Sequence, residues 1–171
     1  MNSFRDIISR WKLRRCAQVG RESEARGRIW IHGRGKVRIG EGVILDGSHY
    51  PIELHALEPG SVIEIGDGVH IAGGASIEAV VSVSVGAGTR IGSFARLMDN
   101  NFHPLMGNRH WRPPSAPVRV GREVEIGARA ILLAGSEVGD RATVGPATVI
   151  TRRLRVAAGQ KISGAPAVVE R

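Results

Sequence analysis

Residues 120–163 read VGREVEIGARAILLAGSEVGDRATVGPATVITRRLRVAAGQKIS, and this stretch decides the fold that we predict. An aliphatic side chain returns in it at every sixth position: Val120, Ile126, Leu132, Val138, Val144, Ile150, Val156 and Ile162. The next position is usually glycine or another small residue, and the fourth is often small or β-branched. The same spacing occurs upstream, at Ile39 and Leu45, at Ile65, Ile71 and Ile77, and at Val85, Ile91 and Leu97.

A repeat of six residues predicts an all-β fold, a parallel β-helix. An amphipathic α-helix has a period near 3.6 residues and a half-buried strand a period of two, so neither explains the pattern. In a β-helix each unit forms one short strand and one turn, and three units close a triangular coil whose aliphatic side chains stack inside. The 23 glycines and the aromatic content of only 4% favour such a repeat over an ordinary β-rich domain.

The longest interruption of the repeat lies between Leu97 and Val120. We expect one protruding loop over residues 98–119, because this segment is polar, rich in proline and contains His103 and His110. Long loops on a rigid scaffold often carry function.

Two further interruptions are shorter. Eight residues separate Ile77 from Val85, which predicts a small bulge. The segment from Asp46 to Gly60, which contains Tyr50, forms either a second loop or an irregular early coil.

Residues 1–28 do not share the repeat. One helical face would carry apolar side chains, and basic residues follow them: Phe4, Ile7, Ile8 and Trp11, then Lys12, Arg14 and Arg15. We expect a short cap, helical or irregular, over the open end of a β-helix domain at 29–171, because terminal coils must be covered. A basic amphipathic helix in peripheral contact with a membrane surface is the alternative.

Composition limits the classes of partner and compartment. The 24 Lys and Arg against 16 Asp and Glu give a net charge of +8, which favours anionic ligands. We expect no nucleic-acid partner, because no recognised binding motif is present and stacking aromatics are scarce. One cysteine, no signal-like apolar core and no apolar run long enough to span a bilayer lead us to expect a cytoplasmic protein.

The repeat and the loop together resemble the hexapeptide-repeat acyltransferases, specifically the galactoside, maltose and polysaccharide O-acetyltransferases. The likeness covers roughly residues 60–171. It is strongest in AILLAGSEVGD at 130–140 and VGPATVITR at 144–152, in the ending GAPAVV at 164–169, and in the pair His103-Pro104. The resemblance implies a left-handed coil, a homotrimer, and acetyl-CoA bound as co-substrate in a groove between neighbouring subunits.

Acetyl transfer to a hydroxyl group requires a base for the hydroxyl proton and a donor that stabilises the oxyanion. The resemblance implies that His103 is this general base, and His110 is the rival in the same loop. Asp99 and Asn101 are candidates for holding a sugar-like acceptor, since carboxylate and amide groups bind sugar hydroxyls. Trp111 is a third candidate, because an indole stacks on a sugar ring.

The resemblance also implies acetyl-CoA contacts at Ala128, Pro146, Thr151 and Arg152. Arg171 is a further candidate for a phosphate ligand because of its charge. Cationic side chains suit the phosphates of coenzyme A. Pro146 stands where the family usually has alanine and has no N–H to donate.

The sequence therefore predicts an acetyl-CoA-dependent O-acetyltransferase of polysaccharide biosynthesis that acts on a sugar or polysaccharide hydroxyl. An N-acyltransferase acting on an amino sugar and a non-catalytic β-helix scaffold remain alternatives. We expect no metal: a zinc carbonic anhydrase on this scaffold needs two histidines five residues apart, and the sequence has no such pair.

Overall fold

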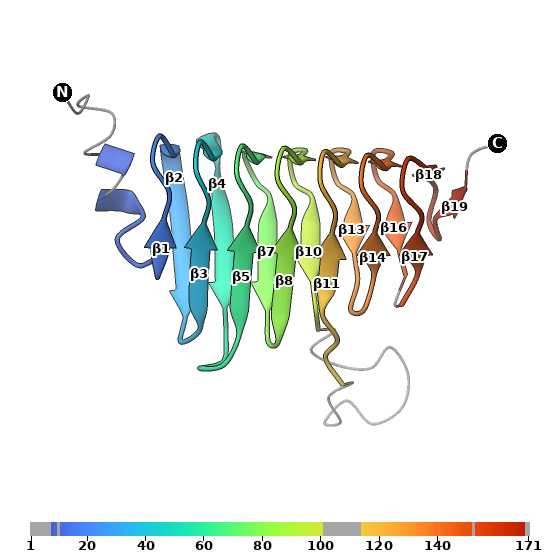
Figure 1. The fold of residues 1–171 in the computed structure, drawn as a ribbon, viewed down its shortest axis with the longest axis horizontal. Helices are drawn as coiled ribbons and strands as arrows, with labels where there is room; N and C mark the ends of the chain where they lie inside the picture. The colour runs from blue at the N-terminus through green and yellow to red at the C-terminus, as the bar shows by residue number, and fades with distance from the viewer. Residues whose placement is uncertain (1–7, 10, 101–113, 152, 170–171) are drawn as a thin grey trace.

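The computed structural model describes residues 8–9, 11–100, 114–151 and 153–169 (Figure 1). In it the chain winds into a parallel β-solenoid of about seven turns, whose coils follow one another along the long axis of the molecule. The predicted all-β solenoid is confirmed. Each coil has three sides, and stacked strands form three faces, which we name A, B and C in the order in which the chain visits them.

Face A is a seven-stranded parallel sheet with one strand from each coil. Its strands are β1 (Gln18–Val19), β3 (Lys36–Ile39), β5 (Val62–Ile65), β8 (Ser82–Val85), β11 (Val118–Val120), β14 (Glu137–Val138) and β17 (Arg155–Val156).

Faces B and C are joined by two long strands, β2 (Glu24–Gly33) and β4 (Ile44–Ala56), which pair with each other around a corner. The first part of β4 pairs with β6 on face B and its last part with β7 on face C. Face B comprises β6 (His70–Ala72), β9 (Arg90–Ile91), β12 (Glu125–Ile126), β15 (Thr143–Val144) and β18 (Lys161–Ser163), to which β19 (Val168–Val169) adds antiparallel. Face C comprises β7 (Ser76–Ala79), β10 (Arg96–Met98), β13 (Ile131–Leu132) and β16 (Val149–Ile150).

The residues between Asp46 and Gly60 thus form an irregular early coil rather than a second loop. They are mostly the corner and the face C half of β4. The long interruption leaves the stacking intact, because Leu97 still pairs with Leu132, and Val85 with Val120.

The core is the column of aliphatic side chains that the period predicts. All eight members between Val120 and Ile162 are between 0 and 5% exposed, and so are the upstream members. Full burial of one such side chain contributes roughly 1.5–3 kcal/mol. The small residues at the fourth position after each aliphatic are buried too: Val124, Ala130, Ser136, Ala142 and Thr148.

The glycine that follows an aliphatic residue is required by the neighbouring coil. A Cβ at Gly127 would lie 2.5 Å from the backbone nitrogen of Pro146, and a Cβ at Gly139 would lie 2.5 Å from that of Ala158. Both distances are far inside van der Waals contact. Coils therefore approach too closely at these corners for any side chain.

The third position after most of these aliphatic residues has a positive φ, which the sequence does not reveal because several of the residues there are not glycine. The φ angles are 60° at Arg129, 56° at Arg141 and 53° at Ala147, whereas Gly159 at the same position has 71°. L-residues adopt this conformation at a cost of about 1–2 kcal/mol. Stacking therefore imposes the same turn geometry on these corners, whether or not glycine stands there.

The described N-terminal residues contact the first coil. A short helical turn includes Ile8–Ser9 and Trp11–Lys12, and it is followed by the buried Leu13. The Ser9 hydroxyl accepts a hydrogen bond from the Ala25 N–H at 3.0 Å, and Lys12 Nζ donates to the Gly27 carbonyl at 2.6 Å. The described turn thus packs against the first coil, and strand pairing begins at Gln18, inside the segment expected to be a cap. No helix in the described part of the chain has the length and hydropathy needed to cross a bilayer.

Two glycine substitutions in neighbouring coils distinguish the cost of a positive φ from the cost of a collision with the next coil. Gly159→Ala meets no atom within 4 Å but retains a positive φ, so we expect it to lower the free energy of unfolding by about 1 kcal/mol. Gly139→Ala collides with backbone, so we expect a loss of about 3 kcal/mol or more. Urea denaturation of both variants measures the difference, and equal losses would contradict close coil stacking as the constraint.

Candidate functional site

The corner between faces C and A, the CA edge, holds the long interruption of the repeat. The chain leaves face C at Met98, at the end of β10, and rejoins face A at Val118, at the start of β11. The described residues at the two ends of this segment, Asp99, Asn100, Ser115 and Ala116, form what we call the neck.

Asp99 fastens the neck to the preceding coil. Its side chain is fully buried, Oδ1 accepts a hydrogen bond from the Val80 N–H at 2.8 Å, and Oδ2 accepts one from the Val81 N–H at 2.6 Å. Burial raises the pKa of the Asp99 carboxyl group above its usual range, and the backbone hydrogen bonds only partly offset this. The small bulge predicted between Ile77 and Val85 therefore supplies the donors that hold the start of the segment.

The two ends of the segment are also bonded to each other. The Ala116 N–H donates to the Asp99 carbonyl at 3.0 Å, and Asn100 Nδ2 donates to Ser115 Oγ at 2.8 Å. Asn100 Oδ1 is buried and has no hydrogen-bond partner in the described structure. The neck therefore fixes where the segment between residues 101 and 113 starts and ends.

Five predicted site residues lie outside the described residues: His103, Asn101, Trp111, Arg152 and Arg171. Their roles stay predictions. Asp99, the other candidate for holding the acceptor, lies in the neck with both carboxylate oxygens bonded to backbone. Direct contact between Asp99 and an acceptor would require the neck to open.

The structure divides the remaining predicted coenzyme residues between two edges. Thr151 is exposed on the CA edge, directly after β16 and two coils beyond the neck. Ala128 and the exposed Pro146 lie on the corner between faces B and C, the BC edge, where the Ala147 N–H donates to the Ala128 carbonyl at 2.8 Å. One subunit therefore does not bring these residues together.

Ala128 and Pro146 differ in what they offer a ligand. The Ala128 N–H makes no hydrogen bond within the described part of the chain and is available as a donor. Pro146 has no N–H, so only its ring and carbonyl group are available.

A column of titratable side chains on face C leads towards the neck and was not predicted. His32, His55 and Glu78 occupy matching positions on β2, β4 and β7, and Glu78 pairs in register with Met98. The imidazole centroids of His32 and His55 lie 5.4 Å apart, and His55 Nε2 lies 4.0 Å from Glu53 Oε2. The unequal lengths of the early coils conceal this alignment in the sequence. No three His, Cys, Asp or Glu side chains among the described residues converge as metal ligands.

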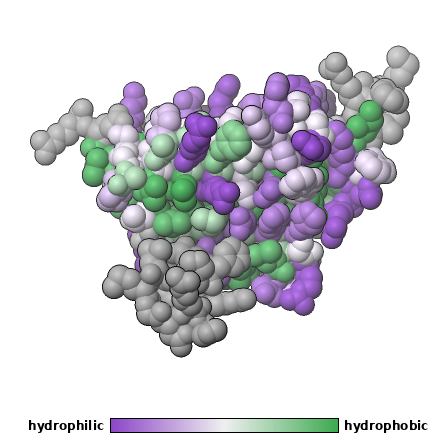
Figure 2. Space-filling view, turned by 180° about the vertical axis from the view of Figure 1, so that it is seen from behind, coloured by the Kyte–Doolittle hydropathy of each residue, from purple (hydrophilic) through white to green (hydrophobic). Residues whose placement is uncertain are grey.

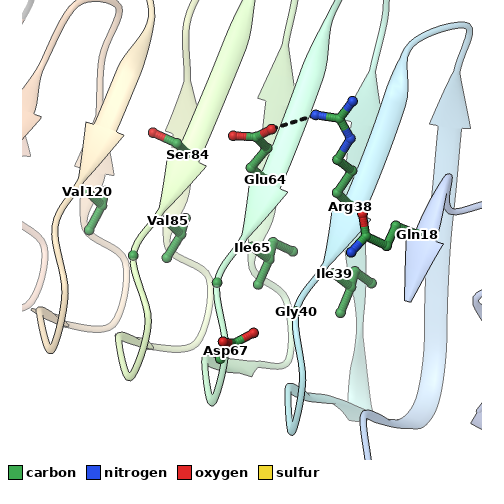
Figure 3. A pocket seen from close by; sticks show the side chains of 12 residues that line it. Gln18, Arg38, Ile39, Gly40, Glu64, Ile65, Asp67, Ser84, Val85 and Val120 are labelled. Atoms are coloured by element: carbon green, nitrogen blue, oxygen red, sulfur yellow. Dashed lines mark hydrogen bonds and ion pairs between the residues drawn. The ribbon is translucent and has the colours of Figure 1, made fainter. Parts of the chain in front are cut away.

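Face A carries a shallow pocket of about 380 Å³ that is lined by one arginine, Arg38, and two carboxylates, Glu64 and Asp67. Figure 3 shows its side chains on successive strands, with Arg38 Nη1 2.7 Å from Glu64 Oε1. Further along, Arg119 and Arg155 each lie 3.3 Å from Glu137. Exposed pairs of this kind contribute little to stability.

The side of the molecule seen from behind (Figure 2) carries both hydrophobic and hydrophilic side chains. Figure 2 shows hydrophobic side chains gathered in patches between hydrophilic ones. On the outer surface of face C, the half-buried Ile131 and Val149 pair in register in the late coils. The faces of the solenoid are thus chemically different, although their backbones repeat.

Asp99 makes stability depend on pH in a defined direction. Because its folded-state pKa is raised, the folded chain holds this proton more tightly than the unfolded chain, and the contribution of Asp99 to stability increases as pH falls from neutral. The wild type and Asp99→Asn differ in their free energy of unfolding, and we expect the wild type minus variant difference to be larger at pH 4 than at pH 7. Urea denaturation at both pH values measures this difference. Asp140→Asn, which changes an exposed side-chain acceptor, is the control, and a decrease would contradict this account.

At neutral pH, Asp99→Ala removes the acceptors of two backbone N–H groups. We expect it to lower the unfolding free energy by roughly 1–3 kcal/mol.

Comparison with known proteins identifies the fold. No known sequence family and no curated protein sequence matches the chain. Among solved structures, a variant of AntD, an N-acyltransferase from Bacillus cereus in complex with dTDP-4-amino-4,6-dideoxyglucose and coenzyme A, superposes with a TM-score of 0.78 at 20% identity. The match covers 100% of this chain and 91% of that chain.

Two further structures are similar. The hexapeptide-repeat-containing acetyltransferase VCA0836 from Vibrio cholerae O1 biovar eltor, complexed with acetyl-CoA, has a TM-score of 0.68 at 17% identity, covering 99% of this chain and 79% of that chain. PerB from Caulobacter crescentus, in complex with CoA and GDP-perosamine, has a TM-score of 0.55 at 19% identity, covering 87% of this chain and 57% of that chain. The chain therefore has the fold of the hexapeptide-repeat acyltransferases.

Proposed function

We propose that this protein is an acyl-CoA-dependent acyltransferase whose acceptor is a sugar attached to a nucleotide. The observation that carries the proposal is the superposition on AntD along the whole chain, because that protein was solved with both coenzyme A and an amino-sugar nucleotide. The net charge of +8 suits two substrates that both carry phosphates.

Within this class we favour an amine as the nucleophile. AntD is an N-acyltransferase, and its ligand carries a 4-amino group. This supports the N-acyltransferase alternative over the O-acetyltransferase that the sequence favours. Transfer to a hydroxyl group is the second candidate, supported by the pair His103-Pro104, which resembles the loop motif of the O-acetyltransferases.

The reaction needs few groups. The neutral amine attacks the thioester carbonyl, a C–N bond forms, the C–S bond breaks, and coenzyme A leaves as its thiol. We assign His103 the role of accepting the proton that the amine loses and returning it to the leaving sulfur, a role for which histidine has a suitable pKa range. Asp99 and Asn100, through the neck, position the segment that carries His103.

The acyl donor is proposed to contact both edges. Coenzyme A supplies a thioester and phosphates that need donors and cations. Ala128 offers a free N–H on the BC edge, whereas Thr151 and the proposed Arg152 would serve on the CA edge. Because these edges lie on different sides of one subunit, we propose a homotrimer with the site between neighbouring copies.

Acyl transfer is tested by incubating the protein with acetyl-CoA or 3-hydroxybutyryl-CoA and either dTDP-4-amino-4,6-dideoxyglucose or GDP-perosamine. We expect thiol release and a product whose acyl group resists hydroxylamine, as an amide does and an ester does not. Light scattering during gel filtration reports the trimer. Binding of no acyl-CoA would contradict the proposal and favour the scaffold.

The proton acceptor is tested separately. His103→Ala should lower kcat/KM by about 10²–10⁴-fold, the usual contribution of a general base, while KM for acetyl-CoA changes little. His110→Ala, a change of the same kind in the same segment, is the matched control and should retain activity near that of the wild type. Full activity in His103→Ala would show that the base is another group.

A further inference from the structure

Three exposed side chains on the BC edge form a cluster that no role above uses. The rings of Tyr50 and Phe94 contact each other with centroids 4.8 Å apart, and the Arg129 guanidinium carbon lies 5.7 Å from the centre of the Phe94 ring. Tyr50 is 54% exposed and Phe94 is 37% exposed. We call these three residues the aromatic edge cluster.

A glycine pair in the coil between them lets the two rings meet. Tyr50 lies at the corner of β4, Phe94 follows β9, and the intervening corner is Gly73–Gly74. A Cβ at Gly74 would lie 2.5 Å from Cδ1 of Phe94, and a Cβ at Gly73 would lie 2.9 Å from the Tyr50 carbonyl oxygen. The space above this corner is therefore occupied by the Phe94 ring.

Phe94 occupies a corner position with a positive φ, a conformation that glycine adopts without strain. Its φ is 61°, and Gly74, which stands at the same position one coil earlier, has a φ of 80°. An aromatic residue in this conformation is strained. Although Phe94 packs against Tyr50, more than a third of its surface stays exposed in the single subunit and can contact a ligand.

Arg129 adds an unpaired charge to the aromatic surface. It follows the next coil's strand, β12, also with a positive φ, and it makes no ion pair within the described part of the chain. Its neighbour Ala128 carries the free N–H described above. A guanidinium beside exposed rings combines a stacking surface with a phosphate ligand.

We propose that the aromatic edge cluster binds the base and the phosphate of a nucleotide. A planar heteroaromatic base stacks on an exposed aromatic ring with little dependence on its identity, and a phosphate attached to it comes within reach of a guanidinium. Two substrates of the proposed function have this chemistry: the nucleoside diphosphate end of an activated sugar and the adenosine phosphate end of coenzyme A. The inference rests on the proposed function for these two sources, and binding measurements without turnover test it separately.

The test uses isothermal titration calorimetry of the full chain with three probes: dTDP, GDP and adenosine 3′,5′-bisphosphate. Phe94→Gly should weaken binding of dTDP and GDP, or of the adenosine bisphosphate, by at least tenfold, and the affected probe identifies the source. Its thermal midpoint should equal or exceed that of the wild type, because glycine relieves the strained φ. Phe94→Tyr keeps a ring and should retain most of the affinity.

Arg129→Gly tests the contact with the phosphate. It should weaken binding of the phosphorylated probe that Phe94→Gly affects at least tenfold, and it should leave binding of the corresponding nucleoside (thymidine, guanosine or adenosine) unchanged. Arg141→Gly is the matched control, since Arg141 is also an exposed arginine with φ near 56° but lies on the corner between faces A and B. It should bind every probe as the wild type does.

Three outcomes would overturn the inference. The wild-type protein could bind none of the probes, or Phe94→Gly could bind all of them with unchanged affinity. In the third outcome, Phe94→Gly has a different oligomeric state in sedimentation velocity. The last would mean that a second copy of the chain covers the rings. Acyl transfer that persists in Phe94→Gly with unchanged nucleotide affinity would remove this inference and leave the proposed function standing.

Discussion

The structure of this molecule depends on the backbone hydrogen bonds that join each coil to the next and align their residues. The N–H groups of Gly86, Gly121 and Gly139 donate to carbonyl groups one coil later, those of Val120, Val138 and Val156, at 2.7–2.9 Å. This repeat holds successive coils about 4.8 Å apart, so that residues at equivalent positions stack directly. Glycine at the tight corners, aliphatic residues inside and a recurring turn geometry in the regular coils follow from that spacing.

The same constraint determines where function can be added. A face cannot accept extra residues, since each of its inner strands is paired on both sides, but an edge can. The 35 positions between Val85 and its stacked partner Val120 include a long added segment, yet the pairing is preserved because the neck closes that segment at one corner. Asp99 makes this possible at the cost of burying a carboxyl group, which is stabilised by backbone N–H groups of the neighbouring coil.

The regular coils could be predicted from the sequence, and the irregular ones could not. From Val120 onward each coil has 18 residues, so the spacing of Leu132 and Ile150 alone places both in one column. In the early coils, Ile39 pairs with Ile65, 26 residues on, and Ile65 with Val85, 20 residues on. No fixed period then predicts that His32 faces His55 or that Tyr50 meets Phe94. Phe94 did carry one local signal, because it stands third after Ile91, where many coils have glycine.

The candidate residues lie on two different edges of the solenoid, and this limits how they could form one site. Ala128 and Pro146 stack on the BC edge, Thr151 and the neck lie on the CA edge, and face C separates the two sets. A rigid prism cannot bend to bring two of its edges together, since its strands are paired along the whole length. A ligand that uses both sets is therefore best accommodated between two copies, where one edge of each faces the other. On this view the flat, repetitive scaffold supplies only precise spacing, and the chemistry comes from what its edges carry.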